Sequence, residues 1–167
     1  MVGLNCDHPD IYEFLHIKQN EEKLSSMNIS ILFTDEFMEA VKNDTDYTLR
    51  YHVESTGENI ERVIRARDFF MEFCETQWDW GDPGALFSDR LNDYHLLAGY
   101  PEYKIEITNP CGEFGGNAYN ACNLASINLY SMIDDKFSDE PKLNEEKFRQ
   151  TVYDGIAALD EIVSYGY

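Results

Sequence analysis

The most informative stretch of this chain is residues 107–128, which read ITNPCGEFGGNAYNACNLASIN. It places a thiol, Cys111, between an amide at Asn109 and a carboxylate at Glu113, and it adds a second thiol at Cys122. Glycines and further amides fill most of the remaining positions. An amide, a thiol and a carboxylate at alternate positions raise the question of what chemistry needs these three groups together.

The residues before this thiol favour extended backbone. Pro110 disfavours a helical conformation at Asn109, and the alternating segment YKIEI (103–107) leads directly into it. Side chains alternate between the two faces of an extended chain. We therefore expect Asn109, Cys111 and Glu113 to point to one side, with no bulky reactive group between them.

The glycine pair Gly115-Gly116 can turn the chain back, so that Cys122 returns near the same volume on a following strand. Such a site would offer a hydrogen-bonding amide, a sulfur that acts as nucleophile or hydrogen-atom donor, an acid–base carboxylate and a reducing thiol. The sequence thus allows a catalytic site around Cys111.

Two other interpretations stay open from the residues alone. A loop cysteine is often structural, and an Asn-Pro turn followed by glycine is common. A zinc site is the weaker alternative, because Cys111 and Cys122 have no accompanying C-x-x-C or H-x-x-x-H pair. His8 precedes Pro9 and is expected to serve a turn or a helix cap rather than a metal.

Composition excludes several classes of function. The 167 residues carry 32 acidic and 13 basic side chains, a formal charge of −19, which repels nucleic-acid backbones. No apolar run approaches the roughly 20 residues of a membrane span, so neither nucleic acid nor a membrane is expected as a partner. Four cysteines without a secretion signal predict free thiols and a cytoplasmic location.

Helical and strand patterns alternate along the chain, which predicts an α/β fold in one domain, residues 1–167. Thr34 is expected to cap the first long helix, and residues 43–58 to form a polar loop. The predicted strands are 1–5, 27–33, 103–107 and 123–129. The predicted helices are 35–43, about 59–79, a short one within 85–94, and about 144–164, the two long ones with their apolar faces turned inward.

The TNPCGE and ACNLASINL motifs together resemble the finger-loop region of the ribonucleotide reductase large (catalytic) subunit, most like the adenosylcobalamin-dependent class II form. Four other segments agree with that family in the same order, so the resemblance covers nearly the whole chain. These segments are CDHPDIYEF (6–14), MNISILFTDEFMEAV (27–41), GDPGALFSDRLN (81–92) and FRQTVYDGIAALDEIV (148–163).

The resemblance implies a role for each residue of the site. Cys111 matches the cysteine that becomes a thiyl radical and abstracts the substrate's 3′-hydrogen, and Glu113 matches the carboxylate that takes the 3′-hydroxyl proton. Asn109 matches the amide that orients the substrate hydroxyls, with Thr108 beside it as a substrate-binding residue. Cys122 matches one of the two cysteines that reduce the 2′-carbon and end as a disulfide.

The resemblance also implies a larger setting. The chain is expected to be an internal fragment, truncated at both ends, of the family's ten-stranded α/β barrel. Adenosylcobalamin is the expected cofactor, and a di-metal radical partner subunit is the alternative. The expected partners are a ribonucleotide substrate, the remaining segments or other subunits of the reductase, and an external dithiol reductant such as thioredoxin.

Two functions from different classes follow. The first is an oxidoreductase fragment that reduces ribonucleotides to 2′-deoxyribonucleotides for DNA synthesis, and that works only when the missing segments complete it. The second is a non-catalytic remnant or interaction module that keeps part of the barrel. The presence of Asn109, Cys111, Glu113 and Cys122 together favours the first, because a remnant has no physical need for all four.

Overall fold

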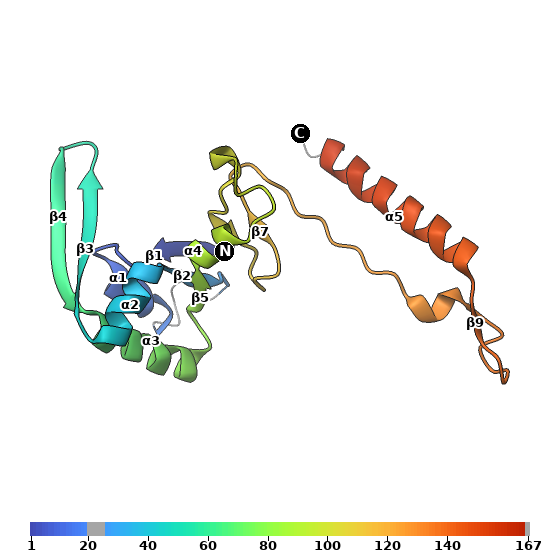
Figure 1. The fold of residues 1–167 in the computed structure, drawn as a ribbon, viewed down its shortest axis with the longest axis horizontal. Coiled ribbons are helices and arrows are strands. Elements are labelled where there is room, and N and C mark those ends of the chain that lie inside the picture. Colours follow the sequence, from blue (N-terminus) through green and yellow to red (C-terminus); the bar gives the residue numbers. More distant parts are fainter. Residues whose placement is uncertain (20–25, 166–167) are drawn as a thin grey trace. The chain divides into compact units, whose positions relative to one another are not determined.

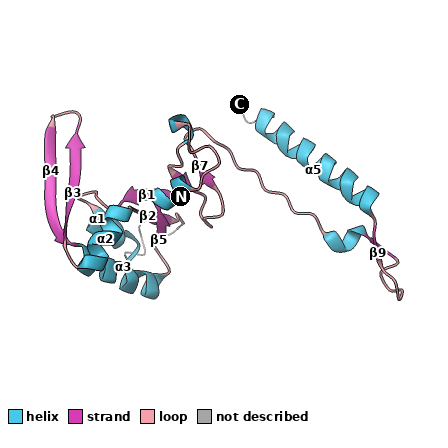
Figure 2. Ribbon diagram, viewed as in Figure 1, coloured by secondary structure: helices cyan, strands magenta, loops and turns pink. Residues whose placement is uncertain are grey.

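A computed structural model describes residues 1–19 and 26–165 of the chain. The chain consists of two compact units, Met1–Tyr119 and Asn120–Tyr167. Figure 2 shows that both units contain helices and strands, which confirms the α/β class. The helices are α1 (Ile11–Leu15), α2 (Asp35–Asn43), α3 (Ala66–Trp80), α4 (Ser88–Asp93) and α5 (Glu145–Tyr165).

The first unit is built on a parallel sheet with strand order β1-β2-β5. β1 (Val2–Asn5) and β2 (Ile29–Phe33) confirm two predicted strands. The short helix predicted within 85–94 is confirmed as α4, whereas the strand β5 (Gly84–Phe87) was not expected. The buried β2 in the centre explains the difference, because pairing with β2 fixes the short apolar run of β5 as a strand.

Aromatic side chains form the core where α2 and α3 cover this sheet (Figure 1). Phe33 on β2 lies at the centre, with its ring 5.3 Å from that of Phe37 and 5.1 Å from that of Phe73. Edge-on and offset ring contacts of this kind add to the stabilisation from burial. The two helices are therefore fixed to the sheet by one shared cluster.

The predicted cap of α2 is confirmed. Thr34 has extended backbone, and its Oγ1 accepts a hydrogen bond of 3.1 Å from Phe37 N. Asp44 ends the helix in the left-handed conformation with φ 55°. A capped start and a left-handed end define α2 by local chemistry alone.

A long antiparallel hairpin replaces a predicted loop and part of a predicted helix. β3 (Asp46–Val53) and β4 (Glu58–Arg65) pair along their full lengths and extend from the core in Figure 1. The expected loop at 43–58 and the helical start near residue 59 are therefore wrong. Ile60 and Ile64 are four residues apart, a spacing that puts two side chains on one face of a strand as well as of a helix.

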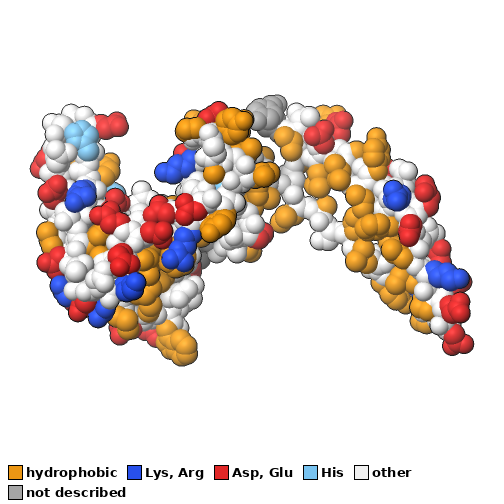
Figure 3. All heavy atoms as spheres, viewed as in Figure 1, with side chains coloured by type: hydrophobic (Ala, Val, Ile, Leu, Met, Phe, Trp, Pro, Cys, Tyr) orange, Lys and Arg blue, Asp and Glu red, His pale blue; other side chains and the backbone are white. Residues whose placement is uncertain are grey.

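The second unit contains a short hairpin and a long helix. β8 (Ile133–Asp134) pairs with β9 (Lys142–Leu143), and α5 confirms the helix predicted at about 144–164. None of the α5 side chains is buried in the described part of the chain, so the inward packing of its apolar face stays a prediction. Figure 3 shows apolar side chains exposed along this helix.

The strand predicted at 123–129 is wrong for the described residues. Residues 121–128 have no regular structure, and Leu129–Met132 form a 3-10 helix. Leu124 is 79% exposed. An alternating apolar segment becomes a strand only when a neighbouring strand takes its backbone hydrogen bonds, and among the described residues none pairs with this one.

No helix among the described residues is long and apolar enough to cross a membrane.

Candidate active site

A short hairpin in the first unit carries Cys111. Its strands are β6 (Ile107–Thr108) and β7 (Gly115–Gly116), paired antiparallel. The predicted strand at 103–107 is thus much shorter than expected, because residues 101–103 form a 3-10 helix instead. The six residues between the two strands include Asn109, Cys111 and Glu113.

The chain turns tightly at Cys111. Gly112 N donates a hydrogen bond of 3.0 Å to Asn109 O, which closes a four-residue turn with Pro110 and Cys111 at its centre. Gly112 has φ 82°, a conformation that favours glycine. The predicted extended backbone is therefore wrong here, and the single-face argument that rested on it no longer applies.

Asn109 holds the base of this turn from both backbone and side chain. Its N donates to Phe114 O at 3.0 Å, and its Oδ1 accepts from Phe114 N at 3.1 Å. The Asn109 Nδ2 group makes no hydrogen bond within the described residues. The side chain thus fixes the turn with one end and keeps a donor for another molecule at the other.

Thr108 lies beneath the turn rather than on its surface. Its side chain is 4% exposed, and its Oγ1 donates a hydrogen bond of 3.0 Å to Asn109 O. That carbonyl also accepts from Gly112 N. The hydroxyl therefore supports the turn from inside, and a direct substrate contact by Thr108 stays a prediction.

Cys111 and Glu113 are the two reactive side chains that the turn presents to solvent, beside the exposed ring of Pro110. Both are exposed, and neither makes a hydrogen bond or an ion pair within the described residues. They flank Gly112, so a thiol and a carboxylate stand one residue apart on a closed loop. An exposed thiol beside an unpaired carboxylate suits chemistry on a bound molecule better than structural support.

Close backbone packing fixes the root of the hairpin. A Cβ on Gly115 would lie 3.0 Å from Ile105 Cδ1, and one on Gly3 would lie 3.1 Å from Ile107 Cδ1. Gly3 belongs to β1, so the absence of a side chain there lets β6 pack onto the parallel sheet. These two glycines were not identified from the sequence, because a close approach across different strands leaves no local pattern.

Cys122 belongs to the second unit and is exposed. The next residue, Asn123, is held to α5, since its Nδ2 donates a hydrogen bond of 3.3 Å to Leu159 O. The return of Cys122 to the neighbourhood of Cys111 stays a prediction. The structure brings together Thr108, Asn109, Cys111 and Glu113 in one hairpin.

Cys6 has the environment of a structural thiol, in contrast with the exposed Cys111. Cys6 is fully buried at the end of β1, and burial raises the pKa of its thiol. Its Sγ lies 3.9 Å from Thr34 Oγ1. A protonated, inaccessible thiol is a poor nucleophile, so Cys6 is not a candidate for the redox chemistry.

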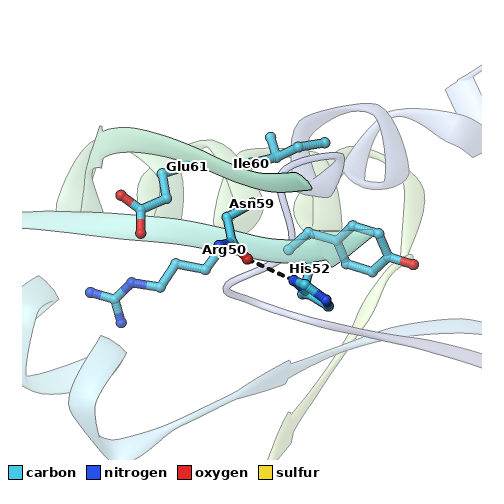
Figure 4. Close-up of a pocket in the computed structure, with 6 residues that line it drawn as sticks. Arg50, His52, Asn59, Ile60 and Glu61 are labelled. Carbon is cyan, nitrogen blue, oxygen red and sulfur yellow. Dashed lines mark hydrogen bonds between the residues drawn. The ribbon is translucent and has the colours of Figure 1, made fainter. Parts of the chain in front are cut away.

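Several cavities lie elsewhere in the first unit. One of about 410 Å³ lies at the carboxyl ends of β1, β2 and β5 and reaches Ile105. Another of about 310 Å³ lies on the β3–β4 hairpin, where His52 Nδ1 and Asn59 Oδ1 are 2.7 Å apart (Figure 4). The sequence did not predict this second cavity, because residues 43–58 were expected to form a loop and not a strand of a hairpin. Neither of these two cavities is lined by a thiol, whereas a third, of about 340 Å³ on α3, is lined by Cys74.

The described residues 1–19 and 26–165 contain no group of three or more His, Cys, Asp or Glu side chains that could hold a metal ion. The zinc interpretation of Cys111 and Cys122 therefore finds no support in this part of the chain.

Comparison with known proteins agrees with the motif resemblance. A family model described as "Ribonucleotide reductase, barrel domain" matches residues 1–167. The chain is 35% identical over 161 residues to the vitamin B12-dependent ribonucleoside-diphosphate reductase of Thermoplasma acidophilum, a match that covers 96% of this chain and 20% of that protein. A Mycobacterium tuberculosis protein of the same name is 36% identical over 146 residues, covering 87% and 20%.

The vitamin B12-dependent ribonucleotide reductase of Streptomyces clavuligerus is 32% identical over 184 residues, covering 96% of this chain and 18% of that protein. The chain thus spans about a fifth of the length of these relatives. The match to the family model covers all 167 residues of this chain, and it agrees with the order of the motifs. The chain belongs to the ribonucleotide reductase barrel-domain family.

Proposed function

We propose that this chain is the part of a reductase's catalytic subunit that holds the hydrogen-abstracting cysteine, Cys111. The observation that supports this most is the closed turn, which presents Cys111 and Glu113 to solvent without internal partners. Membership of the family supports the reaction class, the reduction of ribonucleotides to 2′-deoxyribonucleotides. Residues 1–167 would then be a part of the catalytic barrel.

The proposed chemistry begins with a thiyl radical at Cys111. The sulfur takes the 3′-hydrogen atom of the ribose, so that an S–H bond forms as a C–H bond breaks. Glu113 takes the 3′-hydroxyl proton, and the 2′-hydroxyl takes a proton from a redox thiol and leaves as water. S–H bonds are weak enough for this exchange to be reversible, and the same hydrogen returns to the 3′-carbon at the end.

Cys122 is proposed to supply reducing equivalents to the 2′-carbon. Two thiols give two electrons and end as a disulfide, so Cys122 needs a partner cysteine from another part of the reductase. Asn109 would donate its remaining amide hydrogens to a substrate hydroxyl, because its Oδ1 is already occupied by Phe114 N. Thr108 would assist by holding the carbonyl of Asn109 in place.

Adenosylcobalamin is the proposed radical source, because the relatives described above are named as vitamin B12-dependent. This cofactor supplies carbon-centred radicals when its cobalt–carbon bond opens. No residue of this chain is assigned to the cofactor, and other segments of the reductase would bind it.

The proposed partners follow from the same chemistry. The substrate is a ribonucleotide, and the remaining segments or other subunits complete the barrel. An external dithiol such as thioredoxin would return the disulfide at Cys122 to thiols. A reducing compartment, the cytoplasm, is proposed because all four cysteines are free.

Serine variants in a completed reductase test this proposal. Cys111→Ser should abolish formation of deoxyribonucleotide, because an O–H bond is too strong to replace S–H. Cys122→Ser should also block product, yet it should leave 3′-hydrogen abstraction intact, so that the substrate decomposes and releases its base. Cys74→Ser, on α3 and away from the turn, is the matched control and should keep activity. Normal product from Cys111→Ser would refute the proposal.

A further inference from the structure

The side-chain amide of Asn92 binds the segment that leads into the strand β6 and the Cys111 turn. Asn92, on α4, accepts a hydrogen bond of 2.9 Å at Oδ1 from Ile105 N. Its Nδ2 donates to Ile105 O at 3.1 Å and to Ser88 O at 2.9 Å. Both amide hydrogens are thus used, and the side chain pairs with Ile105 as a neighbouring strand would.

The orientation of this amide is fixed by its partners. Ile105 N can only donate, whereas the carbonyls of Ile105 and Ser88 can only accept, so each end of Asn92 has one permitted place. A carboxylate of the same shape would face two carbonyl oxygens. Aspartate at this position would therefore repel the backbone that asparagine binds.

A continuous set of hydrogen bonds connects Asn92 with the turn. Ile105 is paired with Asn92, and the next residue, Glu106, donates from its N to Gly116 O at 3.0 Å. The β6–β7 pair then follows, and Asn109 closes it against Phe114. From α4 to Cys111, the chain is thus held by successive backbone contacts that begin at one side chain.

We propose that Asn92 is a positioning residue, which fixes the root of the hairpin and thereby the place of the Cys111 sulfur. Its relevance to turnover rests on the function proposed above, whereas its effect on the hairpin does not. Displacement of a reacting group by about 1 Å can cost a factor of about 10² in rate. Asn92 never touches substrate in this proposal, and its influence passes through Ile105.

Hydrogen exchange of the completed reductase tests the structural part without substrate. In Asn92→Ala and more strongly in Asn92→Asp, amides of residues 105–116 should exchange at least tenfold faster than in the wild type. Asn28→Asp is the control, because Asn28 is exposed and its side chain makes no hydrogen bond among the described residues. Faster exchange confined to 88–93 would mean that Asn92 only supports α4, and would overturn the proposal.

Kinetics of the same variants test the consequence for the sulfur. In Asn92→Asp, kcat should fall about tenfold or more while KM stays within about twofold, since the substrate groups remain and the sulfur is misplaced. An unchanged kcat together with faster exchange at 105–116 would overturn the positioning role. Hydrogen exchange needs no substrate, so its result does not depend on whether Cys111 abstracts hydrogen. Failure of the proposed function would instead be recognised from the Cys111→Ser variant.

Discussion

Asn109 and Phe114 form two hydrogen bonds across the base of the turn that carries Cys111. Asn109 N donates to Phe114 O, and Phe114 N donates to Asn109 Oδ1, at 3.0 and 3.1 Å. The residue expected to orient substrate is therefore also the residue that closes the loop. Structure and proposed chemistry are joined in one side chain, so replacing Asn109 would disturb both.

Gly112 offers a cleaner test of the turn, because it carries no reactive group. Its φ of 82° is unfavourable for alanine by about 1–2 kcal/mol. Gly112→Ala should therefore loosen the turn and lower kcat for deoxyribonucleotide formation about tenfold. Gly99→Ala is the control, since a Cβ there would meet nothing within 4 Å. Equal kinetics for both variants would show that the turn geometry is unimportant.

Glu113→Gln should slow hydrogen abstraction by about 10²-fold or more, the usual contribution of a general base. The amide keeps the shape of the side chain but cannot take the 3′-hydroxyl proton. Single-turnover rates measure this step, with Glu102→Gln as an exposed control on the same segment. A rate within twofold of the wild type would exclude Glu113 as the base.

The cap at Thr34 predicts a stability effect. Thr34→Ala should lower the free energy of unfolding by about 1 kcal/mol, whereas Thr34→Ser keeps the hydroxyl and should cost much less. Urea unfolding followed by helix content measures the difference. If serine and alanine cost the same, the hydrogen bond to Phe37 N contributes nothing.

Tyr47 predicts a loss of stability in alkali. Burial raises the pKa of its hydroxyl from 10 to about 12. Above pH 10 the unfolded chain loses this proton while the folded chain keeps it, so stability falls as pH rises from about 10 to 12. Tyr47→Phe should reduce that slope in urea unfolding, and Tyr51→Phe, which is 47% exposed, should not. A slope unchanged by Tyr47→Phe would contradict the assignment.

The exposed face of α5 predicts self-association of the isolated chain. Ile156, Ile162 and Val163 are 63%, 56% and 39% exposed on this helix. Apolar patches of this kind favour association or poor stability. Sedimentation at increasing concentration should show larger species, and Ile156→Glu should reduce them more than Ser164→Glu. A monodisperse monomer with a cooperative unfolding transition would contradict this expectation.

Local chemistry was enough to predict part of the fold. The Thr34 cap and the long amphipathic helix α5 depend on contacts near in sequence, and the continuous apolar run of β2 favours a buried strand by composition; all three were predicted. The β3–β4 hairpin was missed because its apolar spacing of four residues suits helix and strand alike. β5 was missed because its conformation depends on pairing with β2, far away in sequence.

The candidate site shows the same limit. Motif resemblance identified Asn109, Cys111 and Glu113, but alternation predicted the wrong backbone for them, since Pro110 and Gly112 also suit a tight turn. The contribution of Asn92 was not predicted, because its hydrogen bonds join residues thirteen apart through a side chain. A side chain that replaces a strand partner leaves no periodic signal.

The release of 3′-tritium from a labelled ribonucleotide tests the central claim most directly. In a completed reductase with its radical source, Cys122→Ser should release tritium, because abstraction still occurs and no reduced product forms to take the hydrogen back, whereas the wild type should return it to the 3′-carbon. Cys111→Ser should release none, because no other group in the turn can form a radical that takes this hydrogen. Tritium release by Cys111→Ser at the rate of Cys122→Ser would contradict the assignment of Cys111 as the hydrogen abstractor.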